Sequence, residues 1–219
     1  MTRTLTHEEA RSFYDRFGSR QDNQKWYEDA PLADLIAHAD FDRAGNVFEF
    51  GTGTGRIAAQ LLADHLPQDA RYFGVDVSST MVRLSKERLD QWQNRADVQL
   101  TEGSPTLPAG DGQFDRFLST YVFDLLSDTD VDRLIAEAGR ILSVDGKLCV
   151  VGLTRGRGLP SRAVSTVWTL LHRLRPALVG GCRPMSIADR LEPESWRVEH
   201  RSVRSVWGLA SEVLCARKC

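Results

Sequence analysis

Apolar residues near the start of the chain recur at helical spacing. Leu32, Leu35 and Ile36 lie at positions i, i+3 and i+4 between charged residues, as on one face of an amphipathic helix. The pattern predicts helices over residues 6–18 and 29–40. Together these two helices would form an N-terminal cap.

From residue 47 onward, short β-rich runs alternate with helical stretches. Strands are predicted where β-branched and aromatic residues cluster between turn residues, and helices where apolar spacing and capping residues coincide. The predicted strands are 47–50, 71–76, 97–101, 114–120 and 147–153, and the predicted helices between them are 56–66, 79–92 and 128–142. This alternation is typical of a mostly parallel sheet with helices on both faces.

The last third of the chain departs from this alternation. Residues 161–179 form a predicted amphipathic helix with one apolar face (Val164, Trp168, Leu171, Leu174 and Leu178). Residues 196–206 and 210–217 are β-rich and are joined by Trp207-Gly208-Leu209. They predict an antiparallel hairpin on the edge of the sheet, which brings the number of strands to seven.

We predict that residues 1–219 form a single α/β domain, because 219 residues fit one domain and no repeat or long linker divides them. Its parts would be a helical cap or lid (1–42), a cofactor-binding core (46–154), an inserted helical segment (155–195) and the C-terminal hairpin (196–219).

Composition narrows the classes of partner. The net charge of −2 gives no general attraction to nucleic acid or anionic lipid. No apolar signal core or spanning run is present, so we expect a cytoplasmic protein without an integral membrane segment. The four cysteines contain no C-x-x-C pair, and no histidine pairing has metal-ligand spacing, so we predict no metal site.

The strongest chemical signal is a glycine-rich loop between a predicted strand and a predicted helix, Glu49-Phe50-Gly51-Thr52-Gly53-Thr54-Gly55. Its glycines allow the backbone to pass close to a ligand. A dinucleotide fingerprint would need a third glycine where Arg56 stands, and a phosphate-binding P-loop would need Gly-Lys-Ser/Thr where the chain has Gly-Arg-Ile. The loop therefore favours neither a nicotinamide dinucleotide nor ATP as its ligand.

Two acids accompany this loop. Glu49 and Asp76 end consecutive predicted strands, at the sheet edge where open α/β folds bind ligands. An aspartate at position 76 can accept hydrogen bonds from both ribose hydroxyls, and Glu49 suits a cationic amino group. A positively charged nucleoside is the ligand that this pair predicts.

These residues resemble the class I S-adenosylmethionine-dependent methyltransferases. The first motif of the family matches Val47 to Gly55 and the second matches Tyr72 to Asp76. Residues 13–17, 107–108 and 114–115 are most similar to the small-molecule, quinone-biosynthesis-like branch. The resemblance runs from about Phe13 to the hairpin. It implies a Rossmann-like three-layer sandwich with S-adenosylmethionine as cofactor and S-adenosylhomocysteine as product.

The resemblance also implies roles for individual residues. Asp76 would hold the ribose, Val77 and Met81 would flank the adenine, and Glu49 would reach the amino group, through water. The methionine portion would be lined by Gly51, Thr52, Gly53 and Gly55.

Two further segments would complete the cofactor site. Gly103 and Ser104 stand where the family often has Gly-Asp, so the acid that would touch the adenine amino group is replaced by a serine. Adenine recognition would then rest more on backbone groups and apolar packing. Thr120 and Tyr121 would lie beside the sulfonium.

Methyl transfer from a sulfonium needs mainly alignment of the nucleophile and exclusion of water. A phenol or alcohol also benefits from a general base. Candidate bases are Asp124, Tyr14 and the two histidines His38 and His172, of which His38 is more typical of a surface residue. We take Tyr121 and His172 as the candidate catalytic residues.

Aromatic residues of the cap and of the 161–179 helix would enclose the acceptor. The candidate acceptor-binding residues are Tyr14, Phe17, Trp26, Tyr121, Phe123 and Trp168. Such a pocket would be apolar and closed. The sequence therefore predicts methyl transfer from S-adenosylmethionine to a small, apolar or aromatic molecule.

Two other interpretations stay open, and a third is disfavoured. The basic amphipathic helix at 161–179 could lie weakly on a membrane surface, as in a phospholipid or quinone-precursor methyltransferase. The chain could instead be a cofactor-binding module without catalysis. Aminopropyl transfer from the decarboxylated cofactor would require acids that grip a polyamine, which the aromatic cap does not supply. The oligomeric state is not predicted.

Overall fold

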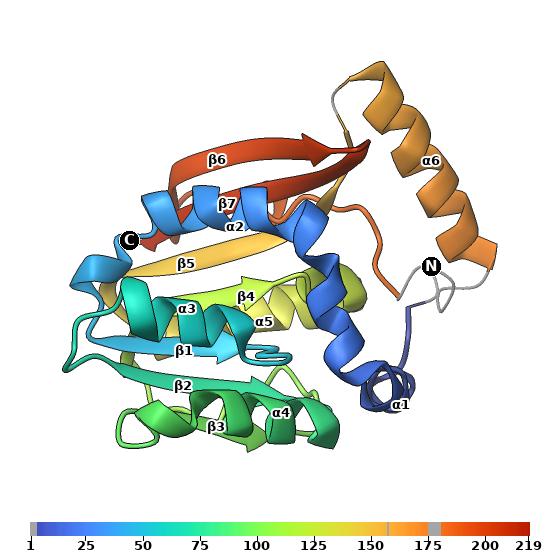
Figure 1. Ribbon diagram of the computed structural model, residues 1–219. Helices are drawn as coiled ribbons and strands as arrows, with labels where there is room; N and C mark the ends of the chain where they lie inside the picture. Colours follow the sequence, from blue (N-terminus) through green and yellow to red (C-terminus); the bar gives the residue numbers. More distant parts are fainter. Residues whose placement is uncertain (1–3, 157, 175–180) are drawn as a thin grey trace.

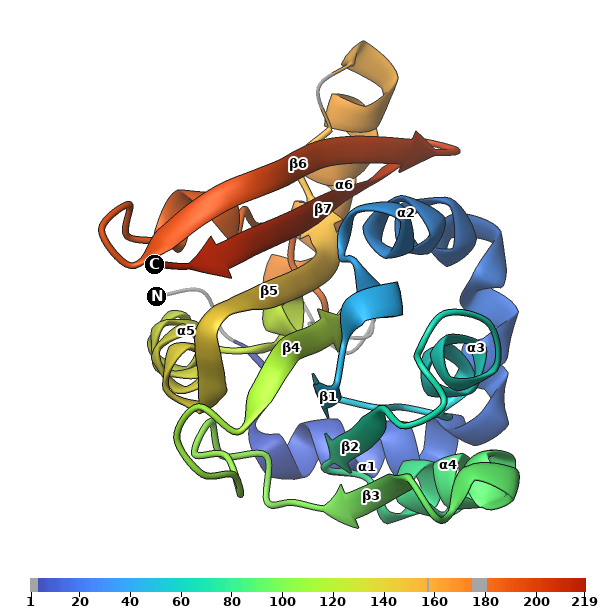
Figure 2. The ribbon, with the colours of Figure 1, turned by 90° about the vertical axis from the view of Figure 1, so that its left-hand side faces the viewer.

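A computed structural model describes residues 4–156, 158–174 and 181–219. One seven-stranded sheet forms its centre, and helices cover both faces (Figures 1 and 2). The strands are β1 (Asn46–Phe50), β2 (Arg71–Asp76), β3 (Ala96–Leu100), β4 (Phe114–Thr120), β5 (Leu142–Thr154), β6 (Trp196–Val206) and β7 (Leu209–Lys218). The α-helices are α1 (His7–Phe17), α2 (Lys25–His38), α3 (Arg56–Asp64), α4 (Ser79–Leu89), α5 (Asp128–Ile141) and α6 (Leu159–Leu174).

The strand order is β3-β2-β1-β4-β5-β7-β6. Strands β1 to β5 pair in parallel, whereas β7 runs antiparallel to both β5 and β6. The predicted seven-stranded, mostly parallel sheet with an antiparallel C-terminal hairpin is therefore confirmed. The hairpin inserts its second strand next to β5 and leaves β6 at the edge.

Each face of the sheet has its own apolar layer. Helices α2, α3 and α4 lie on one side of the sheet and α5 on the other (Figure 2). Leu35 of α2 and Leu61 of α3 are buried in the first layer, and Leu134 of α5 packs with Phe48 and Phe117 in the second. The alternation of buried side chains along the strands supplies both layers, as the three-layer fold requires.

Local capping chemistry fixes where several helices begin. Thr6 and Glu9 form a reciprocal capping box at the start of α1. Ser78 accepts a hydrogen bond from the Met81 amide, and Ser127 accepts one from the Asp130 amide. Each serine satisfies an amide that the first helical turn leaves without a partner.

Several boundaries differ from the predicted ones. Helix α2 begins at Lys25 rather than at residue 29, so Pro31 lies inside the helix instead of in its first turn. Strand β5 follows α5 directly at Leu142. The hairpin turn has two residues, Trp207 and Gly208, both with positive φ, which matches the twist of the paired strands.

Helix α6 leans away from the sheet and contacts β7 (Figure 1). It spans Leu159–Leu174, and residues 175–179 of the predicted helix lie outside the described residues. Within the part of the chain that the structure describes, no helix is long and apolar enough to cross a membrane.

The arrangement places one edge of the sheet under the cap. The order of the strands reverses between β1 and β4, and the carboxyl ends of β1, β2 and β4 point toward α1 and the first half of α2 (Figure 1). Open α/β sheets bind ligands in the crevice at such a reversal.

Candidate active site

The glycine loop folds tightly between β1 and α3. The amides of Gly51 and Thr52 donate to the Val75 carbonyl at 2.8 and 3.1 Å, which ties the loop to β2. Gly51 has φ +83° and Gly55 has φ +73°, in the left-handed region that favours glycine. A Cβ on Gly51 would lie 2.3 Å from Val122. Glycine is therefore required here by close packing as well as by backbone conformation.

Asp76 is held at the end of β2 by the backbone. Its two carboxylate oxygens accept from the amides of Gly53 (2.8 Å) and Ser78 (2.9 Å). Burial raises the pKa of Asp76 to about 6, against the opposing effect of these amide hydrogen bonds. Each oxygen keeps acceptor capacity, so the side chain can still bind hydroxyl groups in the cavity that it lines.

A cavity of about 90 Å³ lies at the ends of β1, β2 and β4. Most of the predicted cofactor-binding residues line it: Gly51, Gly53, Asp76, Val77, Met81, Gly103 and Thr120. Thr52 lines the neighbouring cavity instead. The structure thus brings together residues from four different segments that the sequence assigned to one ligand.

Three predicted cofactor residues line neither of these two cavities. Gly55 packs against Ser85, where a Cβ would come within 2.8 Å. Ser104 accepts a hydrogen bond from the Thr106 amide at 3.3 Å and so stabilises a turn. Glu49 is fully buried behind the loop. The position of Gly55 is therefore fixed by packing, and the Ser104 hydroxyl is engaged within its own turn.

Glu49 retains an unpaired oxygen. The Tyr72 hydroxyl donates to Oε2, whereas Oε1 is buried and has no hydrogen-bond partner among the described residues. Burial raises the pKa of Glu49 to about 8; the Tyr72 hydrogen bond opposes this, and the nearby Asp76 charge adds to it. A buried acceptor of this kind beside the glycine loop fits a cationic amino group, directly or through water.

A second cavity, of about 300 Å³, adjoins the first and is rich in aromatic rings. Four of the six predicted acceptor-binding residues line it: Tyr14, Phe17, Tyr121 and Trp168. Phe13 and Tyr27 add two further rings. The two cavities meet, because both are lined by Tyr14, Gln21, Gly51, Thr120 and Tyr121.

The two other predicted acceptor residues do not reach the cavity. Trp26 is 56 % exposed and contacts the edge of Tyr27. Phe123 is fully buried in the apolar layer that α5 covers. Neither residue lines the aromatic cavity, because the helical face that carries Trp26 turns outward and the short turn after β4 directs Phe123 into the core.

His172 also lies away from both cavities. Its side chain is buried, and Nε2 is 3.1 Å from the Gly181 carbonyl oxygen. Burial lowers the pKa of this histidine. The contact joins α6 to Gly181, so His172 packs between these segments and faces neither cavity. His38, on the last turn of α2, lines neither cavity either.

Tyr121, the other candidate catalytic residue, lines both cavities. It has φ +57°, an unusual conformation for a residue with a side chain, and its hydroxyl is 3.0 Å from Ser211 Oγ. Burial raises the pKa values of Tyr121, Tyr27 and Tyr14. All three therefore stay neutral phenols near pH 7.

The ionic groups in the wall of the aromatic cavity pair with one another. Arg56 binds Glu28 and Asp29, each at 2.8 Å. Asp22 binds Arg88 at 2.6 Å and Thr54 at 2.6 Å. Asp124, the remaining candidate base, is fully buried behind the wall, and burial raises its pKa to about 6.

Sequence reasoning missed several residues that line the smaller cavity. Leu5, His7, Leu125 and Leu126 close its outer side. Gln21 lies over the glycine loop, 2.9 Å from the position of a Cβ on Gly53, and its buried Oε1 has no partner among the described residues. None of these positions carries a local motif. The placement of Leu5, His7 and Gln21 follows from how α1 and the turn after it pack on the sheet, and that of Leu125 and Leu126 from the turn after β4.

Comparison with known proteins agrees with this geometry. The family described as "Methyltransferase domain" matches residues 47–146. An uncharacterized methyltransferase of Bacillus mycoides is 30 % identical over 135 residues, which cover 62 % of this chain and 59 % of the relative. The chain thus spans about three fifths of the length of the curated relatives it matches.

Solved structures share the fold. The geranyl diphosphate C-methyltransferase from Streptomyces coelicolor, in complex with S-adenosyl-L-homocysteine, has a TM-score of 0.67 at 14 % identity over 88 % of this chain and 79 % of its own. The [4+2]-cyclase SpnF has a TM-score of 0.66 at 16 % identity over 87 % and 81 %. With the family match and the curated relative, they confirm the predicted resemblance to the class I S-adenosylmethionine-dependent methyltransferases. S-adenosylmethionine is the cofactor that this family uses.

Proposed function

We propose that this protein binds S-adenosylmethionine and transfers its methyl group to a small, neutral, apolar or aromatic molecule. The observation that carries this proposal is the junction between the two cavities. Thr120 and Tyr121, at the end of β4, line both of them. A methyl group held beside these residues would face the aromatic cavity directly, as in-line transfer requires.

The residues around the smaller cavity fit the cofactor. Asp76 can accept from the ribose hydroxyls while backbone amides hold its carboxylate in place. Val77 and Met81 offer apolar surface for the adenine. The buried, unpaired Oε1 of Glu49 offers an acceptor for the amino group of the methionine portion. Bound S-adenosylmethionine would supply an activated methyl group on a sulfonium.

The protein itself would contribute alignment and exclusion of water. The aromatic rings of Tyr14, Phe17 and Trp168 surround the space that faces the junction, and such a wall removes water from the nucleophile. The three cavity tyrosines stay protonated near pH 7, because burial raises their pKa values. They can donate hydrogen bonds but cannot serve as bases.

The charges of the cavity favour a neutral acceptor. Among the described lining residues, Arg56 is the only arginine or lysine, and Glu28 and Asp29 already engage its guanidinium. A phosphate or carboxylate on the acceptor would therefore lack a free cation to pair with. This argues against an acceptor that resembles geranyl diphosphate.

A lipophilic acceptor taken from a membrane surface is the second candidate. Val167 and Leu170 on α6 are each 58 % exposed, and Trp207 at the hairpin tip is 90 % exposed. Trp168 of α6 and Leu209 of the hairpin line the aromatic cavity, so these exposed residues adjoin its wall. An amphipathic helix with such a surface is suited to a lipid interface.

Transfer of a labelled methyl group tests the proposal. The purified protein is incubated with S-adenosylmethionine that carries a tritiated methyl group and with phenols, thiols, amines or quinone precursors. Matched analogues that bear a carboxylate serve as controls. We expect transfer to a neutral acceptor and weaker transfer to its carboxylated analogue. Cofactor binding without transfer to any acceptor would favour the non-catalytic module, and transfer only in the presence of lipid vesicles would favour the membrane-surface enzyme.

A further inference from the structure

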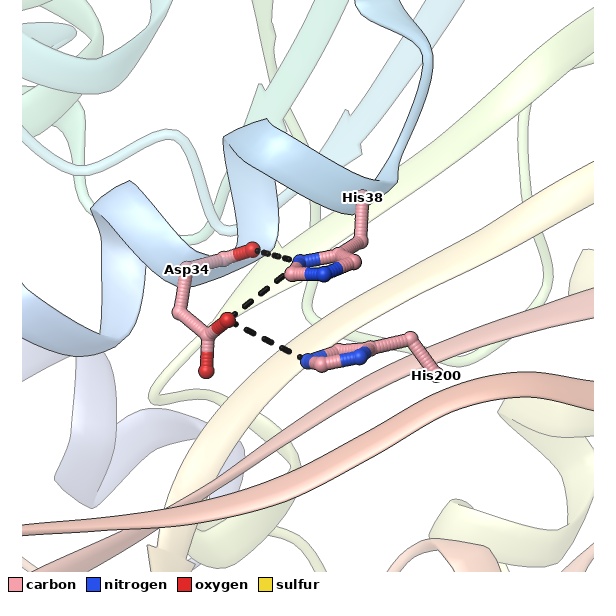
Figure 3. A group of neighbouring side chains, drawn as sticks. All are labelled: Asp34, His38 and His200. Carbon is pink, nitrogen blue, oxygen red and sulfur yellow. Dashed lines mark hydrogen bonds and ion pairs between the residues drawn. The ribbon is translucent and has the colours of Figure 1, made fainter.

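Two histidines and an aspartate gather between α2 and β6, away from both cavities (Figure 3). Asp34 and His38 lie one turn apart on α2, and His200 comes from the edge strand β6. Asp34 Oδ1 is 3.3 Å from His38 Nδ1 and 3.2 Å from His200 Nε2. All three ligand atoms lie within 4.8 Å of one another.

These distances suit a small divalent metal ion. Zinc binds histidine nitrogen and carboxylate oxygen at roughly 2.0–2.2 Å in a tetrahedron, which sets neighbouring ligand atoms about 3.3 Å apart. The 3.2 Å distance between Asp34 Oδ1 and His200 Nε2 matches that spacing. Two imidazoles and one carboxylate form a donor set that zinc and similar first-row metals accept.

The surroundings orient Asp34 as a ligand. Its Oδ2 accepts hydrogen bonds from the Ser202 hydroxyl and from Arg204 Nε, the latter at 2.7 Å. These contacts hold the carboxylate and leave Oδ1 directed at the two histidines. Hydrogen bonds of this kind from outside a metal site fix the orientation of its ligands.

His200 supplies an independent observation. Its Nε2 is buried and makes no hydrogen bond to a described residue, although Asp34 Oδ1 lies 3.2 Å away. Buried polar atoms are normally hydrogen-bonded, and an exception calls for an explanation. A metal ion between His200 and Asp34 would give this nitrogen its partner.

The exposed side of the cluster gives an ion access. The His38 side chain is 44 % exposed. Its ring stacks on that of His200, with centroids 3.6 Å apart and planes 6° from parallel. Parallel rings do not aim their nitrogens at one point, and His38 Nδ1 lies 2.8 Å from the Asp34 backbone carbonyl oxygen. To bind an ion, His38 would have to give up this hydrogen bond and rotate about its Cβ–Cγ bond, and its exposure leaves room for that movement.

We propose that Asp34, His38 and His200 bind a divalent transition-metal ion of the zinc type. The ion would join the C-terminal turn of α2 to the edge strand β6. The first turns of the same helix carry Tyr27 and Glu28, which line the aromatic cavity. The bound ion therefore acts as a structural clamp that fixes the helix over the cavity, and it takes no part in methyl transfer.

Calorimetric titration with zinc chloride tests this proposal on tag-free protein that has first been treated with a chelator. We expect a zinc ion at this cluster to bind with a dissociation constant in the micromolar range or below and to raise the melting temperature. Both effects should weaken in His38→Gln and in His200→Gln, with affinity lower by at least about tenfold. His65→Gln, which alters a histidine outside the cluster, is the matched control and should bind as the unchanged protein does.

Both histidine variants leave Asp34 and its contacts with Ser202 and Arg204 in place. His38 is partly exposed, so its variant should fold even if that of His200 does not. Failure of the unchanged protein to bind zinc would overturn the proposal. Equal zinc affinity in His38→Gln and the unchanged protein would also overturn it.

Discussion

Tyr72 donates a hydrogen bond to Glu49 beneath the glycine loop, and both side chains are buried. Tyr72 is the second residue of β2, and Glu49 is the last residue but one of β1. The pair places an acid with one unpaired oxygen directly behind the loop. It links the packing of two parallel strands to the recognition of a cationic group.

The pair predicts a dependence of stability on pH. Burial raises the pKa of Glu49 from an ordinary 4.5 to about 8. Between these values the unfolded chain has released a proton that the folded protein keeps, so this group lowers the free energy of unfolding as pH rises. In Glu49→Gln that loss is absent. Urea denaturation at several pH values should show that the free energy of unfolding of the variant rises relative to that of the unchanged protein from about pH 5 to pH 8.

Glu87→Gln is the matched control for this measurement. Glu87 lies on α4, is 60 % exposed and pairs only with Arg83 in the described structure. Exposed pairs contribute little to stability, so its pH profile should follow that of the unchanged protein. If the stability of Glu49→Gln changes with pH in the same way as that of Glu87→Gln and of the unchanged protein, the raised pKa of Glu49 is contradicted.

Removal of Asp76 should weaken cofactor binding. In Asp76→Ala the ribose hydroxyls lose their charged acceptor, and such hydrogen bonds contribute about 1.5–3 kcal/mol each. Calorimetric titration should show an affinity for S-adenosylmethionine at least about tenfold lower. Asp97→Ala, at an exposed position on β3, should leave affinity unchanged. Equal affinities in the two variants would contradict the ribose assignment.

Two tryptophans near the cap provide a matched pair for the acceptor cavity. Trp168 lines the cavity, whereas Trp26 is exposed and does not. Loss of aromatic contact in Trp168→Leu should raise the KM for the acceptor about tenfold, which corresponds to about 1.4 kcal/mol. The KM for S-adenosylmethionine should change little. Trp26→Leu should leave both KM values unaltered. A larger rise in the KM for the acceptor in Trp26→Leu than in Trp168→Leu would contradict the assignment of the aromatic cavity to the acceptor.

Gly55 should be intolerant of a side chain. It is the N-cap residue of α3 with φ +73°, and a Cβ would lie 2.8 Å from Ser85. Left-handed conformation costs a residue other than glycine about 1–3 kcal/mol, so Gly55→Ala should lower the free energy of unfolding by at least that amount. Gly110→Ala, where a Cβ meets ordinary contact at 3.5 Å, is the control. Urea denaturation measures both, and equal stability would contradict the packing argument.

Local patterns were sufficient to predict the elements of the sheet and the glycine loop. Each strand has its own apolar run, and Ser78, which precedes the helical stretch, caps α4. Gly51, Gly53 and Asp76 converge because consecutive parallel strands end at the same sheet edge. These features depend on short stretches of sequence and on one general rule of topology.

Side-chain direction in the cap and in irregular turns could not be predicted in this way. Trp26 and Tyr27 are consecutive residues of α2 and point about 100° apart around its axis, so the orientation of the helix on the sheet decides which of them faces the cavity. Phe123 lies in a short 3-10 turn whose direction no apolar periodicity encodes. The metal-ligand cluster joins Asp34 and His38 to His200, more than 160 positions later in the chain, so no spacing rule would have found it.

Calorimetric titration of the unchanged protein with S-adenosylmethionine, S-adenosylhomocysteine and NAD tests the central claim most directly. The geometry predicts binding of the first two at one site per chain and no binding of NAD, because the glycine loop and Asp76 fit the nucleoside and Glu49 fits an amino group. Binding of NAD, or failure of both S-adenosyl compounds to bind, would contradict the assignment of this cavity to the methyl donor.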